Sequence, residues 1–390
     1  MSGPRSVIVD AVRSPVGRAH KGSLVDVRPD DLAGAVVRAL LDRNPAAEEA
    51  GIDELVCGCA YPWGEQGYNV GRQVALLAGL PDTTPAFTVA RACASSLQAL
   101  RSADHAVRAG EGDVYIVSGV ESVSRVGRDR HLATPNPRLD SEQDGELIAD
   151  VFMPMLETAE RVAERYGISR EEMDAYGQRS QERAVAAQRD GSFAREIVPV
   201  VRADGETVTA DDGPRPGSTI AGLAALSPVL GEGGSVTAGN SSPLNDGAAA
   251  LLVMSQERAA ELGLRPRARI VASGVSALDP TMMGMGPVEA VRRALAYAGL
   301  RLDDMDVIEL NEAFAAQVIP VMRELGTDED DPRLNPRGGA IALGHPFGMT
   351  GARIMTTLLN GLEIADGRYG LETMCVGGGQ GQAMIVERLA

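Results

Sequence analysis

The stretch AVVRAL at residues 35–40 recurs as AVRRAL at residues 290–295, an offset of 255 positions. Both copies have the apolar spacing of an amphipathic helix. Each is followed, after an acidic turn, by a strand-like run, IDELV at residues 52–56 and MDVIE at residues 305–309. These paired segments indicate an internal duplication, which would fix the architecture of the whole chain.

A third pair keeps nearly the same offset: VYIVS at residues 114–118 and LETMC at residues 371–375. Two halves that alternate strand and helix predict parallel sheets covered by helices, because βαβ crossovers bury both faces of a sheet. The stretch 119–239 between them is rich in turns and charged helices, so we interpret it as an inserted, surface-exposed subdomain. Chance similarity in a chain rich in Ala, Val and Arg is the alternative explanation of the repeat.

The composition predicts a globular protein of two or three domains, since the chain has 390 residues and domains average about 100–200 residues. The hydrophobic fraction is 44%, and 37 basic residues stand against 54 acidic ones, giving a net charge of −17. Nucleic acids and membrane surfaces are polyanionic, so this charge disfavours both as partners. An anionic ligand would need a local group of arginines.

Lysine is almost absent, because Lys21 is the only one in the chain. A phosphate-binding P-loop needs a Gly-Lys pair, whereas Lys21 follows His20. Schiff-base chemistry, including that of pyridoxal phosphate enzymes, would have to depend on Lys21. Both classes are therefore disfavoured.

The cysteine content fits a reducing compartment, since four cysteines in a chain of this length are too few for a disulfide framework. We found no apolar segment typical of a signal peptide and no apolar run near the about 18 residues of a membrane span. The expected location is the cytoplasm, without membrane insertion. Cys57 and Cys59 alternate along a predicted strand with no histidine pair nearby, so we interpret them as structural residues and predict no metal site.

The duplication brings two reactive side chains into equivalent positions, because His345 follows Cys93 by 252 residues. Cys93 lies where a strand-like run turns into a helix, and the positive end of that helix is expected to lower its pKa and favour the thiolate. His345, within GHPFGMTG, also lies just before a predicted helix. A thiol facing an imidazole is the arrangement that nucleophilic catalysis requires. A buried structural cysteine and an ordinary turn histidine are the alternatives.

Two further segments carry polar groups at strand ends. Cys375 opens CVGGGQG directly after a strand-like run, and the backbone N–H groups of such glycines can hold a developing oxyanion. A dinucleotide-binding loop is disfavoured because G-x-G-x-x-G is not matched, but a plain glycine turn beside a buried cysteine stays open. Asn311 ends the second copy of the repeated strand, where it could donate to an oxygen, hold a water or cap a helix.

Four ordered motifs together resemble the thiolase family, whose members cleave or form 3-ketoacyl-CoA by Claisen chemistry. They are GHPxG at residues 344–348, CxGGGxG at residues 375–381, NEAF at residues 311–314 and TAGNSSxxNDGA at residues 237–248.

The resemblance covers nearly the whole chain and implies an α/β fold in which duplicated βαβαβ halves form a layered α-β-α-β-α core. The N-terminal half would span 1–118 and be completed by about 240–265, the inserted CoA-binding loop domain would span 119–239, and the C-terminal half would span 266–390.

The resemblance also implies roles for five residues. Cys93 would be the nucleophile that becomes acylated, and His345 would take its proton. Cys375 would protonate the acetyl-CoA enolate, or remove the α-proton of acetyl-CoA in the synthetic direction. A water held by Asn311 would stabilise one oxyanion together with His345, and the backbone N–H groups of Gly377 and Cys93 would stabilise the other.

The substrates implied are CoA and its acyl thioesters, with no permanently bound cofactor and no metal. Met155 would contact the pantetheine chain, Arg215 and Ser242 would contact the adenine end and the pantetheine, and Met283 would line the acyl pocket. Ordinary core packing is the alternative for the methionines. The family's members are typically homodimers or homotetramers.

Two residues depart from the family pattern: Ser96 occupies a place where glycine is common, and Arg91 one that is often Asn or Asp. With these two residues, the sequence does not fix how closely the helix packs beneath the nucleophile. Pro154 is typical of degradative members, whereas short-chain synthetic members often carry histidine there. This favours a 3-ketoacyl-CoA thiolase of broad or unknown chain length, acting in fatty-acid β-oxidation. The alternatives are a short-chain acetyl-CoA acetyltransferase and, from another class, a thiolase-like carrier that binds acyl-CoA or lipid without turnover.

Overall fold

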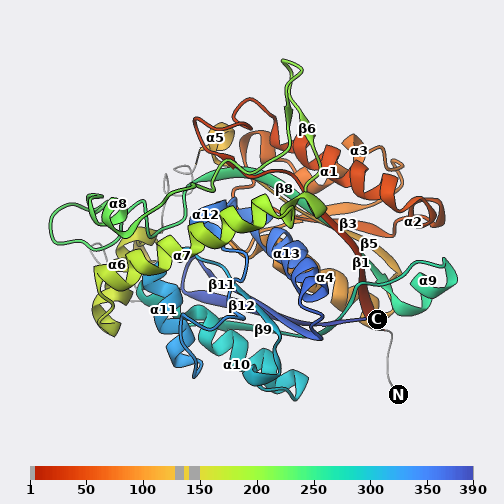
Figure 1. Ribbon diagram of the computed structural model, residues 1–390. Helices are drawn as coiled ribbons and strands as arrows, with labels where there is room; N and C mark the ends of the chain where they lie inside the picture. The colour runs from red at the N-terminus through yellow and green to blue at the C-terminus, as the bar shows by residue number, and fades with distance from the viewer. Residues whose placement is uncertain (1–4, 128–135, 140–149, 390) are drawn as a thin grey trace.

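A computed structural model describes residues 5–127, 136–139 and 150–389 (Figure 1). The strands are β1 (Ser6–Arg13), β2 (Gly17–Arg18), β3 (Glu54–Gly58), β4 (Ala86–Val89), β5 (Val114–Ser122), β6 (Val200–Val201), β7 (Thr207–Val208), β8 (Asn245–Ser255), β9 (Ala268–Ala277), β10 (Val307–Leu310), β11 (Tyr369–Val376) and β12 (Gln380–Arg388). The α-helices are α1 (Pro29–Arg43), α2 (Pro45–Ala50), α3 (Val70–Leu77), α4 (Ser95–Ala109), α5 (Val123–Val126), α6 (Met155–Tyr166), α7 (Arg170–Arg189), α8 (Ile220–Ala224), α9 (Gln256–Glu261), α10 (Gly286–Ala298), α11 (Ala315–Glu324), α12 (Ala340–Leu343) and α13 (Thr350–Ile364). The 3₁₀ turns are η1 (Gly64–Gln66), η3 (Pro137–Leu139), η4 (Phe193–Arg195), η5 (Pro280–Met285), η6 (Leu302–Asp304) and η7 (Phe347–Met349).

The sheet order confirms the duplication. In the described residues the main sheet runs β10-β11-β12-β9-β1-β8-β5-β3-β4, with β2 paired to β8. The series β1-β8-β5-β3 therefore has the same arrangement as β9-β12-β11-β10, and the two series meet where β1 pairs with β9. The 15-residue helices α4 and α13 start at residues 95 and 350 and so keep the 255-residue offset.

The expectation of parallel sheets is only partly correct. Pairing is parallel between β3 and β4, β3 and β5, and β10 and β11, but antiparallel at β8, β9 and β12. The reason is visible at β11 and β12, which are joined by the short turn 377–379. A turn of that length permits only an antiparallel return, so each half has a mixed sheet.

The halves stack as the layered core that the sequence predicts. Helices α4 and α13 pack on each other between the strands of both halves, while α1 and α3 cover the outer face of one half and α10 and α11 that of the other (Figure 1). Three hydrophobic clusters fill the spaces between these layers. No helix among the described residues is long and apolar enough to cross a membrane.

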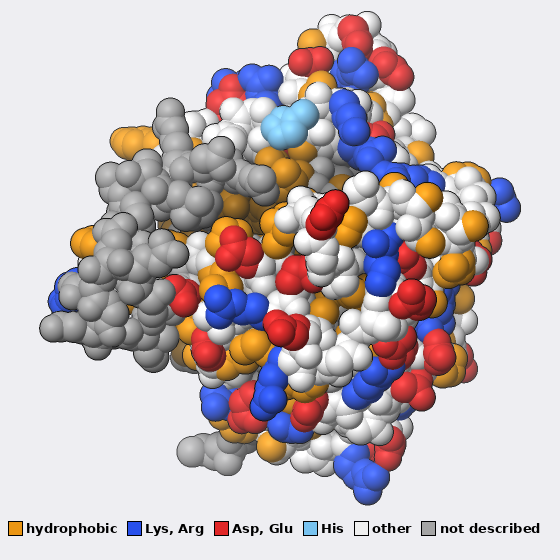
Figure 2. Space-filling model, turned by 90° about the vertical axis from the view of Figure 1, so that its left-hand side faces the viewer, with side chains coloured by type: hydrophobic (Ala, Val, Ile, Leu, Met, Phe, Trp, Pro, Cys, Tyr) orange, Lys and Arg blue, Asp and Glu red, His pale blue; other side chains and the backbone are white. Residues whose placement is uncertain are grey.

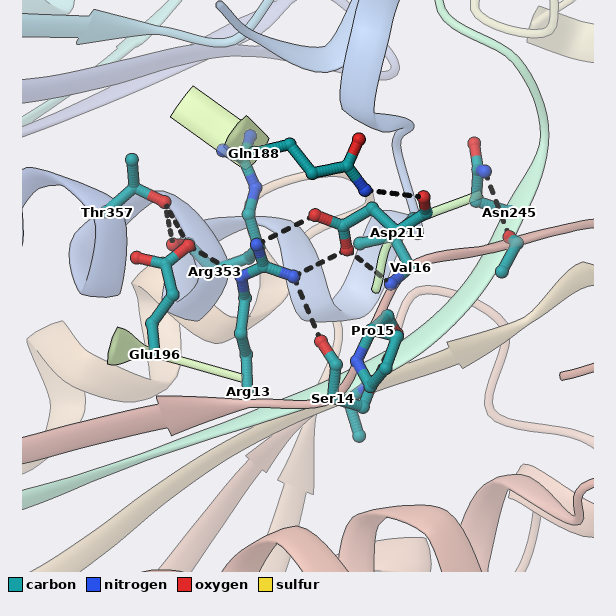
Figure 3. Close-up of polar contacts among 12 residues, drawn as sticks. Arg13, Ser14, Pro15, Val16, Gln188, Glu196, Asp211, Asn245, Arg353 and Thr357 are labelled. Carbon is teal, nitrogen blue, oxygen red and sulfur yellow. Dashed lines mark hydrogen bonds and ion pairs between the residues drawn. The ribbon is translucent and has the colours of Figure 1, made fainter. Parts of the chain in front are cut away.

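A buried ion cluster fastens the inserted segment to this core (Figure 3). Arg13, at the end of β1, donates from Nη1 and Nη2 to the carboxylate of Asp211 at 2.7 and 2.9 Å and from Nε to Glu196 at 2.7 Å. Thr357 of α13 donates to the same Glu196 at 3.1 Å. Because an unpaired buried charge is costly, these contacts fix the insert firmly against both halves.

Candidate active site

Cys93 lies in the short connection between β4 and α4. Ala92, just before it, has a left-handed φ of 42°, a conformation that residues with a side chain adopt rarely. Helix α4 begins two residues later at Ser95. The tight bend places the thiol at the start of the helix, with 9% of Cys93 exposed.

The prediction that this helix start lowers the pKa of Cys93 is wrong. Burial, with the nearby charge of Glu121 acting in the same direction, raises the pKa of the thiol to about 12. The N–H groups of Gly377 and of Cys93 itself act in the opposite direction without offsetting burial. The resting thiol is therefore protonated, and a base must remove its proton for it to act as a nucleophile.

His345 is held as a neutral imidazole with a defined tautomer. Its Nδ1 lies 2.7 Å from the hydroxyl oxygen of Thr350, which itself donates to the carbonyl of Pro346 at 2.8 Å. Since that hydroxyl proton is already used, Nδ1 carries the donated hydrogen, and the unprotonated Nε2 accepts from Nδ2 of Asn311 at 3.3 Å. Burial, and then the charge of Arg353, lowers the pKa of His345 to about 3. The resting imidazole is therefore neutral, and its tautomer makes Nε2 the nitrogen that can take up a proton.

Asn311 faces the same nitrogen. It follows the last residue of β10, where its backbone N–H donates to Thr373 at 3.0 Å, and its Nδ2 lies 3.3 Å from His345 Nε2. Its side-chain oxygen is buried and has no hydrogen-bond partner among the described residues. Asn311 therefore offers an acceptor to a water or a substrate while its amide group contacts the imidazole.

Cys375 lies near the carboxyl end of β11 and is fully buried. Burial raises the pKa of its thiol, and the charge of Cys93 raises it further, which places the two sulfurs close together. The glycine turn follows at once: Gly378 and Gly379 have φ of 79° and 76°, values that favour glycine. This turn directs the N–H of Gly377 at the Cys93 thiol.

The helices behind the two reactive groups are in direct contact. The hydroxyl of Ser96 accepts a hydrogen bond from the N–H of Ala352 at 2.9 Å, which joins α4 to α13. Ser96 fits because Gly58 and Gly119 lie against it, and a Cβ on either would collide with Ser96. Its departure from the family pattern thus creates a bond between the halves rather than loosening the helix.

The proposed CoA contacts fall into two groups. Met283 is buried and packs in the same hydrophobic cluster as Cys375, with Met155 at its edge, while the N–H of Ser242 donates to Ala313 at 3.0 Å. Arg215 is exposed on the inserted segment, and its N–H donates to Gln181 at 2.8 Å.

The face beside the inserted segment has the surface features expected for binding an anionic thioester. Burial, and then the charge of Arg18, lowers the pKa of Arg215, so these two arginines lie near one another. On this face, basic side chains form a band beside a hollow with hydrophobic side chains (Figure 2).

Sequence reasoning missed three residues of the site: Thr350, Arg353 and Glu121. Thr350 follows His345 by five residues and is the first residue of α13, so its spacing was a usable signal. The charge on Arg353 and the contacts of Glu121 depend on packing between distant segments, which the sequence does not display. Within the described residues, no three His, Cys, Asp or Glu side chains gather as metal ligands.

Comparison with known proteins gives matches over almost the whole chain. Residues 6–257 match the sequence model of the thiolase N-terminal domain, and residues 264–388 match that of the thiolase C-terminal domain. The chain is 46% identical to a beta-ketoadipyl-CoA thiolase of Acinetobacter baylyi (98% of this chain, 99% of the relative) and 48% identical to a 3-ketoacyl-CoA thiolase of Pseudoalteromonas translucida (98% of each). The crystal structure of the Bacillus anthracis acetyl-CoA acetyltransferase superposes with a TM-score of 0.90 at 38% identity, covering 100% of both chains.

Proposed function

This chain belongs to the thiolase family, and we propose that Cys93, His345 and Cys375 divide its reaction among them. The activity is an acyl transfer, the thiolytic cleavage of 3-ketoacyl-CoA to acetyl-CoA and a shortened acyl-CoA, or its reverse. The observation that carries the assignment of roles is the tautomer of His345: Thr350 holds the hydrogen on Nδ1 and leaves Nε2 free to act as a base.

The first half-reaction transfers the acyl group to Cys93. Nε2 of His345 takes the thiol proton as the sulfur attacks the 3-keto carbon, so no resting thiolate is needed. The N–H groups of Cys93 and Gly377 stabilise the oxyanion that forms, each such donor contributing about 3 kcal/mol. The C2–C3 bond then breaks, its electron pair passes to the acetyl-CoA enolate, and the acyl group stays on Cys93.

Cys375 completes this half-reaction as the acid. Its raised pKa keeps the thiol protonated until the enolate carbon takes the proton, and a water held by Asn311 stabilises the enolate oxygen together with His345. Acetyl-CoA leaves, and the thiol of a second CoA attacks the acyl group on Cys93. The Cys375 thiolate takes the proton of the CoA thiol, His345 returns its proton to the sulfur of Cys93, and the shortened acyl-CoA leaves. CoA is a substrate throughout, and the scheme uses no bound cofactor.

The CoA moiety is assigned to the inserted segment, residues 119–239, and the residues that border it. Arg215 with Arg18 supplies positive charge for CoA phosphates in a chain whose net charge is −17. Ser242 and Met155 are assigned to the pantetheine chain and Met283 to the acyl group. Location in the cytoplasm agrees with four buried free cysteines.

A homodimer or homotetramer is part of this proposal. Strand β4 is the last strand of the main sheet, so it has a free edge, and its residue Phe87 is 38% exposed. A free sheet edge with an apolar side chain is a favourable place for a second copy to pair.

The acyl substrate is proposed to be longer than the four-carbon acetoacetyl group. Relatives carry two kinds of name, 3-ketoacyl-CoA thiolase and beta-ketoadipyl-CoA thiolase, so a 3-ketoacyl group that ends in a carboxylate is the second candidate. Initial rates of thiolysis with acetoacetyl-, 3-ketooctanoyl- and 3-ketoadipyl-CoA separate them. Activity confined to acetoacetyl-CoA would reject both in favour of a short-chain acetyltransferase.

Mass spectrometry tests the division of roles. Incubation with acetyl-CoA should acetylate Cys93 in the unaltered protein and in Cys375→Ala, whereas Cys375→Ala should lose carbon–carbon cleavage. Cys57→Ala, which removes another buried thiol, is the matched control and should keep both steps. No acetyl adduct on Cys93 of the unaltered protein would reject catalysis and favour an acyl-CoA carrier.

A further inference from the structure

Glu121 is a fully buried carboxylate at the carboxyl end of β5, next to the loop that carries His345. Its Oε2 accepts hydrogen bonds from the N–H groups of Ala60 and Gly348, both at 2.9 Å. Its Oε1 accepts one from Nε2 of Gln66 at 2.6 Å. The reaction proposed above gives this residue no chemical step, yet it joins the loop after β3 to the loop of the base.

The His345 loop has little freedom where Glu121 holds it. Gly348 lies so close to β5 that a Cβ would collide with the carbonyl of Val120 and lie 2.8 Å from the Cα of Cys59. Between Gly348 and the base, the ring of Phe347 meets the imidazole of His345 edge-on, with ring centres 4.9 Å apart. A displacement of Gly348 from Glu121 would therefore be transmitted to the imidazole three residues away.

Gln66 fixes the chemical state that this position requires. Its Oε1 accepts from the N–H of Ser122 at 2.6 Å, and its Nε2 donates to Tyr61 at 2.9 Å as well as to Glu121. The amide is thus locked with its N–H group toward Glu121. Since Ala60, Gly348 and Gln66 all donate to Glu121, both of its oxygens must accept, and an amide at position 121 would place a donor against a donor.

We propose that Glu121 is a positioning residue for the thiolase reaction: its carboxylate clamps the His345 loop to β5 and thereby holds the imidazole in line with Cys93. This role rests on the proposed function of those two residues. The clamp opposes a second effect of the same group, because the charge of Glu121 raises the pKa of Cys93. Loss of the charge alone would make the thiol easier to deprotonate and speed acylation, whereas loss of the clamp slows it.

The test is Glu121→Gln in the full chain. Thiolysis of acetoacetyl-CoA should show kcat reduced about 100-fold, the loss typical of a small misplacement of catalytic groups, with KM for CoA within about twofold. Acetylation of Cys93 by acetyl-CoA should slow in parallel. Asp104→Asn is the matched control: it removes another buried carboxylate, nine residues along α4 from Ser95, and should keep kcat.

Rescue separates positioning from a general loss of structure. The double variant Glu121→Gln with Gln66→Glu again sets one donor against one acceptor between the two side chains. Because it removes the donor to the carbonyl of Tyr61, it should recover only part of the lost kcat. Glu121→Asp keeps the charge but withdraws both oxygens by one methylene group; it should lower kcat about tenfold and serves if Glu121→Gln does not fold.

The outcomes are distinct. An unchanged or faster acetylation of Cys93 in a folded Glu121→Gln protein would overturn the clamp, as would a folded double variant with no recovery. If instead the unaltered protein assayed alongside neither acetylates Cys93 nor cleaves acetoacetyl-CoA, the proposed function fails and the clamp fails with it.

Discussion

The two halves of the molecule share one arrangement of strands and helices but carry different chemistry at equivalent places. The start of α4 presents a thiol, on a bend strained at Ala92. The start of α13 presents an imidazole, on a longer loop bounded by Gly344 and Gly348 and fixed by Thr350. Because α4 and α13 lie side by side, the duplication places the loops that carry Cys93 and His345 at the starts of two adjacent helices.

The pKa values of the two thiols also depend on where each cysteine lies in its half. Cys93 stands on a loop, where the N–H groups of Gly377 and of its own backbone favour the thiolate, whereas Cys375 stands in a strand, where its own N–H is the only group that favours it. Burial raises both pKa values, but Cys375 is additionally disfavoured as a thiolate by the charge of Cys93. The halves therefore supply two thiols in different environments, as the roles proposed for Cys93 and Cys375 require.

The largest effect is expected from removing the nucleophile of the first half. Cys93→Ala leaves no atom to carry the acyl group, so thiolysis of acetoacetyl-CoA should fall by about 10⁴-fold or more. Steady-state rates at saturating CoA measure this. Cys57→Ala, a buried cysteine of the same half, should retain the rate; a comparable loss there would mean that burial of any thiol, and not nucleophilicity, decides activity.

In the second half, the residue to substitute is Thr350, which fixes the tautomer of His345. Thr350→Val keeps the shape of the side chain but removes the acceptor for Nδ1–H, so the hydrogen is free to move to Nε2 and the base is lost for part of the time. We expect kcat to fall about 100-fold with KM for CoA little changed. Thr350→Ser, which keeps the hydroxyl, should recover most of that loss. Equal rates for the Val and Ser variants would contradict the assigned tautomer.

The comparison of the halves also shows what a sequence can reveal. The paired segments and the positions of Cys93 and His345 follow from local pattern and a constant offset, and the structure confirms the duplication that the offset predicts. The pKa of Cys93 could not be predicted in this way, because the helix start is a local feature whereas burial depends on every layer around it. Glu121 and Arg353 could not be predicted for the same reason. Glu121 accepts a hydrogen bond from Gly348, 227 residues along the chain, and the charge of Arg353 acts on His345 through space.

Acid pH provides a test that distinguishes the imidazole from the thiols. The pKa of His345 is about 3 in the folded chain, and an unfolded histidine has a pKa of about 6.5, so the unfolded state binds a proton that the folded state excludes. Stability from this residue is present above pH 6.5 and is lost as the pH falls toward 3. When the pH is lowered from 7.5 to 5, the free energy of unfolding measured with denaturant should fall by about 2 kcal/mol more in the unaltered protein than in His345→Asn. His105→Asn, at an exposed site, is the control. If the unaltered protein lost no more unfolding free energy than His345→Asn, the neutral, buried imidazole would be contradicted.

The smallest effect is expected at the bond between the helices themselves. Ser96→Ala removes the acceptor of the Ala352 N–H, which is buried between α4 and α13, and should cost about 1 kcal/mol of unfolding free energy. Activity should stay within about threefold, because close packing of Gly351 against Leu97 still holds the helix starts together. Ser102→Ala, on the same helix but bonded only within it, should cost less. If the two substitutions cost the same, the Ser96 hydroxyl contributes nothing to joining the halves, and glycine packing alone sets the distance between thiol and imidazole.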